Sequence, residues 1–170
     1  MIRVQREDFD VGAELARLAG GGDVGAVTSF VGVVRGDGGL TAMTLEHYPG
    51  MTERELEAIA AEAGRRWRIL DLAIVHRYGR LVPGDRIVLA AVASQHRADA
   101  FAACEFLVDW LKTRAPFWKL EESVGGTRWV PASADDDARA ARWQRPHPTR
   151  RPPSPGRARP RHRNRRATPP

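Results

Sequence analysis

The last 27 residues, 144–170, cannot contribute to a hydrophobic core, and this confines the fold to the residues before them. They contain nine arginines, eight of the twelve prolines, no acidic residue and no aliphatic side chain larger than alanine. Such a segment buries too little apolar surface to offset the entropy that it would lose on ordering. We therefore predict one folded domain, residues 1–143, followed by a disordered Arg/Pro-rich tail, residues 144–170.

The tail also carries the basic character of the chain. It contributes +9 to a formal net charge of +6, so residues 1–143 have a net charge of −3. A cationic tail can attract nucleic acid or anionic surfaces, and the alternative is an extension without a function of its own. No aromatic residue is interleaved to stack on bases, which favours the alternative. Nucleic acid is therefore not the partner that we expect.

The remaining composition bounds the compartment and the cofactors. A single cysteine, Cys104, excludes an internal disulfide framework and a cysteine-based zinc cluster, and we expect it to pack as a small apolar residue. Charges at the N-terminus occupy the place of the apolar run of a signal peptide, and the longest apolar run, residues 87–93, is too short to span a bilayer. We expect a cytoplasmic protein that binds no membrane.

Strand-like and helix-like patterns mix along the chain without a regular order. Strands are predicted at 2–5, 24–34, 41–48, 70–78, 86–94 and 127–130, and helices at 11–19, 52–67 and 97–113. Thr52 and Glu55 form a predicted capping box, and Pro116 disfavours helix at the residue before it. Neither a βαβ repeat nor a glycine-rich dinucleotide motif is present. The pattern indicates an α+β fold, in which an antiparallel or mixed sheet is packed by two long helices.

Lysine use is restricted to one short segment. The chain has 25 arginines but only two lysines, Lys112 and Lys119, and both lie in the stretch from Leu111 to Leu120. An amine can lose a proton and act as a base or nucleophile, which guanidinium cannot do. The pair therefore indicates a chemical requirement. The alternative is chance, or a cation placed at a helix end by the helix dipole.

Two further sequence features could add cations to the same site. Ser94-Gln-His96-Arg97 lies where a strand leads into a helix N-terminus, a place that suits an anion. Arg35 ends a strand beside a glycine loop, where ligand-facing residues are common. Alternatively, Ser94 caps the helix and the basic residues are merely exposed. If the fold brings Arg35, His96, Arg97, Lys112 and Lys119 together, they would hold an anionic small molecule, such as a phosphate, beside an amine.

Two other histidines, His47 and His76, lie on strand-like segments. Lone histidines in such places are more often hydrogen-bonded structural residues than ligands. Neither has metal-ligand spacing to a carboxylate, so no metal is predicted.

Several of these segments, in this order, resemble the large, catalytic subunit of molybdopterin synthase. The resembling segments are Phe30–Arg35, Leu45–Met51, His76–Gly79, Pro83–Asp85, Ser94–Arg97 and, most specifically, Leu111–Lys119. They span the predicted folded part. The resemblance implies an α/β hammerhead fold and a homodimer within a heterotetramer. It also implies a partner on each catalytic subunit, a small ubiquitin-like sulfur carrier that ends in a Gly-Gly thiocarboxylate.

The resemblance further implies a reaction, its residues, and a subunit that needs no bound metal or organic cofactor. Two sulfurs would pass from the carrier to cyclic pyranopterin monophosphate and form the dithiolene of molybdopterin, in molybdenum cofactor biosynthesis. Lys112 matches the essential lysine and Lys119 the second lysine. The implied substrate-binding positions are Val33, Val34, Arg35, His96, Arg97, Lys112, Lys119, Leu120 and Glu121. Val33 and Ser133 stand where some relatives have basic residues.

Two alternatives to a sulfurtransferase follow from the same sequence. A noncatalytic nucleic-acid-binding module would depend on the basic tail and would show steeply salt-dependent binding. A scaffold could keep the fold and carrier docking but lack the chemistry, through the departures at Val33 and Ser133.

Overall fold

The computed structural model describes residues 1–131 and 134–144, so Ser133 and all of the predicted tail except Gln144 lie outside the described residues. The elements, in order, are β1 (Ile2–Gln5), α1 (Val11–Ala19), β2 (Ala26–Val33), a 3-10 turn η1 (Asp37–Gly39), β3 (Leu40–His47), α2 (Met51–Arg66), β4 (Ile69–Arg77), β5 (Gly79–Leu81), β6 (Arg86–Ser94), α3 (Arg97–Thr113), β7 (Phe117–Ser123), β8 (Gly126–Val130), α4 (Ala134–Ala141) and a second 3-10 turn η2 (Arg142–Gln144).

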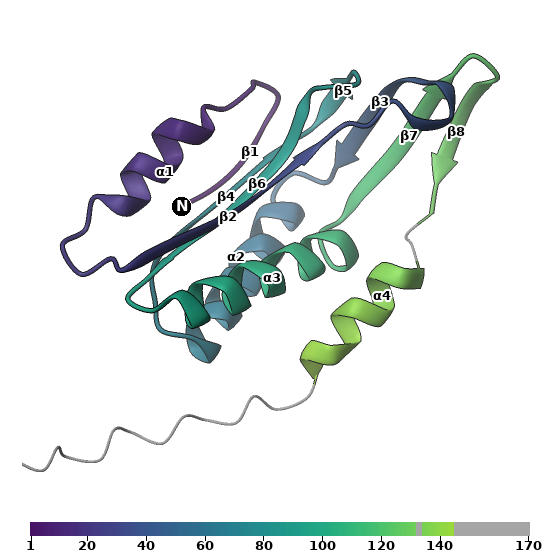
Figure 1. Ribbon diagram of the computed structural model, residues 1–170. Coiled ribbons are helices and arrows are strands. Elements are labelled where there is room, and N and C mark those ends of the chain that lie inside the picture. Colours follow the sequence, from purple (N-terminus) through teal and green to yellow (C-terminus); the bar gives the residue numbers. More distant parts are fainter. Residues whose placement is uncertain (132–133, 145–170) are drawn as a thin grey trace, which may run out of the picture.

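The described strands form two four-stranded sheets (Figure 1). The central sheet has the order β1-β4-β6-β2 and is mixed, because β1 runs parallel to β4 while the other pairs are antiparallel. The outer sheet has the order β5-β3-β7-β8 and is antiparallel throughout. This arrangement confirms the α+β prediction. The division of the strands into two sheets did not follow from the strand patterns.

Helices cover both faces of the central sheet. The α2 and α3 helices pack on the face that presents Ile74, Ala90 and Val92. The α1 helix packs on the opposite face, through Leu18. Strands buried on both faces are continuously apolar, and β6 accordingly lacks the alternation of a half-exposed strand. The core of the protein therefore consists of two apolar layers on either side of one sheet.

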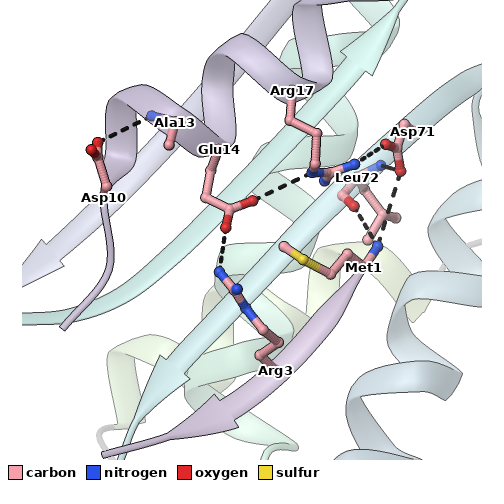
Figure 2. A network of polar contacts seen from close by, with 8 residues as sticks. All are labelled: Met1, Arg3, Asp10, Ala13, Glu14, Arg17, Asp71 and Leu72. Atoms are coloured by element: carbon pink, nitrogen blue, oxygen red, sulfur yellow. Dashed lines mark hydrogen bonds and ion pairs between the residues drawn. The ribbon is translucent and has the colours of Figure 1, made fainter. Parts of the chain in front are cut away.

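A polar network holds α1 against the edge of the central sheet (Figure 2). Asp10 caps the helix by accepting a hydrogen bond from the Ala13 N–H at 3.0 Å. Glu14 contacts the guanidinium of Arg3 on β1. Arg17 contacts Asp71 on β4 at 2.5 Å, and this ion pair ties the far end of α1 to the sheet.

The C-terminal elements α4 and η2 dock on α3. The buried carboxylate of Asp109 accepts hydrogen bonds from Arg142 and from Trp143 Nε1, both at 2.6 Å. The Trp143 ring packs edge-on against Trp67 and Phe106, with centroid distances of 5.7 and 5.5 Å. Residues 142–144 therefore fasten the half of α3 that leads to Lys112.

The predicted capping box of α2 is wrong in its register. Gly50 adopts a φ of 80°, which favours glycine, and the helix begins one residue earlier than predicted, at Met51. The Glu53 carboxylate, rather than that of Glu55, accepts the hydrogen bond from the Gly50 N–H, at 2.6 Å. Thr52 lies inside the first turn, where its hydroxyl donates to the Tyr48 carbonyl.

Candidate functional site

The inner face of the outer sheet carries Lys119 and Glu121. Leu45 pairs with Lys119 and Met43 with Glu121 across the β3–β7 ladder. Residues that pair directly across antiparallel strands point to the same face. Met43 and Leu45 are buried together with Val34 in one apolar cluster. Lys119 and Glu121 therefore lie on the face that packs toward the end of β2.

Glu121 bridges two cations on this face. Its Oε1 atom lies 3.1 Å from Lys119 Nζ, and its Oε2 atom lies 3.0 Å from a terminal nitrogen of Arg128 on β8. Hydrogen bonds from Arg128 first, and from Lys119 second, hold the pKa of the Glu121 carboxyl below its usual value. The carboxylate therefore stays ionised, and its charge is shared between an amine and a guanidinium.

A pocket of about 390 Å³ lies beside Glu121, between η1 and the β7–β8 hairpin. Asp37, Glu121 and Arg128 contribute charged groups to its wall. Arg35 Nε lies 3.4 Å from Asp37, and 84% of the Arg35 side chain is exposed. The structure therefore brings Arg35, Lys119 and Glu121 to one region, a convergence that the sequence had left open.

Lys112 lies at the end of the molecule that carries Arg35 and the end of β2. The α3 helix begins just after β6 ends, and Cys104 in its middle contacts the Ala90 carbonyl in the middle of β6. The helix thus runs back along β6 toward Arg86, which pairs with Val33 at the end of β2. Lys112 is exposed in the last turn, and no ion pair or hydrogen bond joins it to another residue that the structure describes.

His96 and Arg97 lie at the opposite end of α3. Lys112 lies sixteen positions after His96, a distance of about 24 Å along the helix at 1.5 Å per residue. Within one chain, the fold does not bring them together with the lysines. Ser94 does not cap the helix, because His96 holds the N-cap position and Ser94 is buried, with its hydroxyl donating to the Arg68 carbonyl. Asp99 adds a carboxylate to the first turn.

The three apolar residues of the predicted substrate-binding set differ in their exposure and orientation. Val33 is 44% exposed at the end of β2, beside Arg35. Val34 is buried, and its backbone bonds to Asp85 and Gly84. Leu120 pairs with Thr44 and Trp129, so its side chain points to the outer face of the sheet, away from Lys119.

The two lone histidines belong to β3 and β4, and their rings lie beside Phe117 at the start of β7. His76 is buried, stacks on Phe117 at a centroid distance of 3.7 Å, and places Nδ1 2.9 Å from the Arg77 carbonyl. Burial lowers the pKa of His76 to about 4, so the ring is neutral at physiological pH. His47 lies 4.5 Å from the Tyr78 ring and 6.0 Å from Phe117. These contacts agree with a structural role for His76.

Cys104 is buried on α3, as predicted for a small apolar residue. Burial raises the pKa of its thiol to about 11, which keeps the sulfur protonated. In residues 1–131 and 134–144, no group of three His, Cys, Asp or Glu side chains could hold a metal ion. No described helix is long and apolar enough to cross a membrane.

Arg128 and Asp37 belong to the site but were not predicted from the sequence. Arg128 is recognisable only from the register that pairs it with Glu121. Asp37 is recognisable only from the turn that folds it over the pocket. In the sequence both are ordinary charged residues near glycines, and no spacing marks them.

Comparisons with known proteins agree on one family. The family model described as "MoaE protein" matches residues 4–114. The molybdopterin synthase catalytic subunit of Ralstonia nicotianae is 56% identical over 146 residues, which are 84% of this chain and 83% of that protein.

Solved structures share the fold. The molybdopterin biosynthesis MoaE protein from Burkholderia ambifaria has a TM-score of 0.75 and 57% identity, over 86% of this chain and 99% of that one. A chain from the complex of subunits 1 and 2 of molybdopterin-converting factor from Helicobacter pylori has a TM-score of 0.66 and 20% identity, over 76% and 89% of the two chains. The chain belongs to the MoaE family, the family of molybdopterin synthase catalytic subunits, which are enzymes of molybdenum cofactor biosynthesis.

Proposed function

We propose that this protein transfers two sulfurs from the C-terminal thiocarboxylate of a small ubiquitin-like carrier to cyclic pyranopterin monophosphate, which forms the dithiolene of molybdopterin. The observation that carries this proposal is the grouping of Arg35, Lys112, Lys119 and Glu121 at one end of the molecule, where Glu121 lines a pocket of about 390 Å³. That grouping supplies cations for an anionic substrate and two amines for proton transfer in a single region.

The roles of the two lysines follow from their surroundings. Lys112 has no charged partner among the described residues, so its amine is open to the acyl end of the carrier. We assign it the chemical step, in which an amine moves protons or transiently traps the acyl group. Lys119 is held by Glu121 at 3.1 Å, and we assign it to substrate binding. The exposed guanidinium of Arg35 suits the phosphate of the substrate.

Direct transfer of sulfur from the carrier to the substrate is consistent with the burial and protonation of Cys104, the one cysteine of the chain. A cysteine that relays sulfur must be accessible and ionised. Cys104 is buried, its Sγ atom contacts the Ala90 carbonyl at 3.5 Å, and its pKa is raised to about 11. The thiocarboxylate sulfur therefore passes to the pterin without a cysteine intermediate on this chain.

The carrier partner is proposed on two grounds. The Helicobacter pylori structure is described as a complex of two molybdopterin-converting factor subunits, and this chain shares its fold. The reaction also requires a sulfur donor, which the buried Cys104 does not provide. We propose a heterotetramer, in which two catalytic subunits form a dimer and each binds one carrier in the cytoplasm.

The homodimer explains the position of His96 and Arg97. Both are exposed, yet they lie about 24 Å from Lys112 along α3 of their own chain. We propose that they complete the site of the partner subunit, where they bind the phosphate or the pterin oxygens. Phe101, one turn after Arg97, is 62% exposed and is suited to burial in such an interface.

An anaerobic assay tests this function. It combines the purified protein, thiocarboxylated carrier and cyclic pyranopterin monophosphate, and measures the dithiolene product. We expect two sulfurs incorporated per pterin and no product when the carrier ends in an ordinary carboxylate. Carrier binding without product would instead support the scaffold alternative.

A further inference from the structure

Glu121 forms a bridge between Lys119 and Arg128, and the roles proposed for the site residues do not explain this bridge. Glu121 uses one oxygen for each cation, at 3.1 Å and 3.0 Å. The Lys119 side chain is 36% exposed and that of Arg128 is 76% exposed. Arg128 is thus a surface guanidinium that reaches back to a carboxylate at the pocket wall.

We propose that Arg128 is a positioning residue for Lys119. By occupying Oε2 of Glu121, it weakens the hold of that carboxylate on the Lys119 ammonium, which can then leave Glu121 for the anionic substrate. This inference rests on the proposed function, in which Lys119 binds substrate. Without Arg128, the full charge of Glu121 would face one amine, and Lys119 would be a poorer ligand.

The other groups that face Lys119 do not replace Arg128 in this role. Met43 and Leu45 on β3, and Val130 on β8, are apolar neighbours on the same face. Asp37, which lines the pocket beside Glu121, is paired with Arg35. Among the described residues, Arg128 is therefore the cation that contacts Glu121 in competition with Lys119.

The outer face of the same sheet provides a matched control. Arg80 on β5 binds Glu122 through two nitrogens, at 3.1 and 2.9 Å, and no lysine shares that carboxylate. Arg80→Gln removes an exposed Arg–Glu pair from the same sheet, as Arg128→Gln does. It does so on the side that faces away from Lys119.

Because the whole chain has only two lysines, the mobility of the Lys119 amine can be measured directly. Reductive methylation with ¹³C-formaldehyde labels Lys112, Lys119 and the terminal amine, and Lys112→Arg assigns the signals by NMR. We expect Arg128→Gln to raise the order parameter of the Lys119 methyl groups, because Glu121 then holds that amine alone, and Arg80→Gln to leave it unchanged. A Lys119 order parameter in Arg128→Gln equal to that of the wild type would overturn the proposal, whether or not the protein transfers sulfur.

Kinetics with unlabelled protein test the consequence for substrate. We expect Arg128→Gln to raise KM for the pterin about threefold while kcat is retained, and to have no further effect in a Glu121→Gln background. An equal rise in KM in both backgrounds would show that Arg128 binds substrate directly, and would contradict a role through Glu121. An inactive wild-type protein would instead contradict the proposed function, and the NMR result would still stand.

Discussion

His96 and Lys112 lie at the two ends of α3, about 24 Å apart along the helix axis. A pterin ligand cannot contact both side chains of one chain across that distance. If both residues act on one substrate, each site must take His96 from one subunit and Lys112 from the other.

A mixed dimer tests this arrangement. A heterodimer with Lys112→Arg in one copy and His96→Ala in the other keeps one complete site, so we expect about half of the wild-type activity. Each parent homodimer should be close to inactive. The measurement is dithiolene formation by heterodimers isolated through two different affinity tags. A heterodimer as inactive as its parents would show that each site uses its own His96.

Trp143 should stabilise the folded protein through its ring and its indole N–H. We expect Trp143→Ala to lower the free energy of unfolding by about 3 kcal/mol, because it removes the edge-on contacts with Trp67 and Phe106. Trp143→Phe keeps a ring but loses the hydrogen bond to Asp109, and should cost about 1 kcal/mol. Urea unfolding measures both. Equal costs for the two variants would contradict the separate contribution of the ring.

His76 should make stability depend on pH between its two pKa values. Burial lowers the pKa from the ordinary 6.5 to about 4 in the folded protein. As the pH falls below 6.5, the unfolded chain binds a proton that the folded protein does not bind until near pH 4. The free energy of unfolding therefore falls across this window, by on the order of 3 kcal/mol in total.

The variant His76→Phe keeps a ring beside Phe117 but cannot titrate. We expect its unfolding free energy to fall less steeply between pH 6.5 and 4 than that of the wild type. Urea midpoints at several pH values give both slopes. Parallel slopes would show that His76 is not the group responsible.

Removal of residues 145–170 distinguishes the sulfurtransferase hypothesis from the nucleic-acid-binding hypothesis. The truncated chain keeps η2 and the Trp143 contacts, so we expect an unchanged unfolding midpoint and largely retained synthesis of molybdopterin. The rival predicts that steeply salt-dependent binding to nucleic acid is the main activity and is lost with the tail. Activity and binding at several salt concentrations should be compared in the two proteins.

The sequence predicted much of the fold because several elements carry strong local signals. The bounds of α3 at Arg97 and Thr113 match the prediction, since amphipathic spacing and Pro116 mark the helix and its end. The α4 helix was missed because its first turn is a run of aspartates and it contacts the core mainly through Ala140. The register of α2 was wrong because Gly50, with its positive φ, starts the helix earlier than Thr52 would.

The site was predicted in its residue types more than in its arrangement. No strand was predicted over Phe117–Ser123, so the face that Lys119 and Glu121 share became visible only with β7. Their bridge to Arg128 depends on the register of the β7–β8 hairpin, which no local pattern encodes. The separation of His96 from Lys112 follows from the length of α3, but the sequence does not show whether a second subunit closes the gap.

The single-turnover reaction of Lys112→Arg tests the central claim most directly. The variant keeps a positive charge at the end of α3 but removes an amine that can become neutral. With thiocarboxylated carrier and cyclic pyranopterin monophosphate under anaerobic conditions, we predict a fall in dithiolene formation of at least about a hundredfold, with carrier binding retained. Wild-type turnover by Lys112→Arg would contradict the role of the Lys112 amine in sulfur transfer.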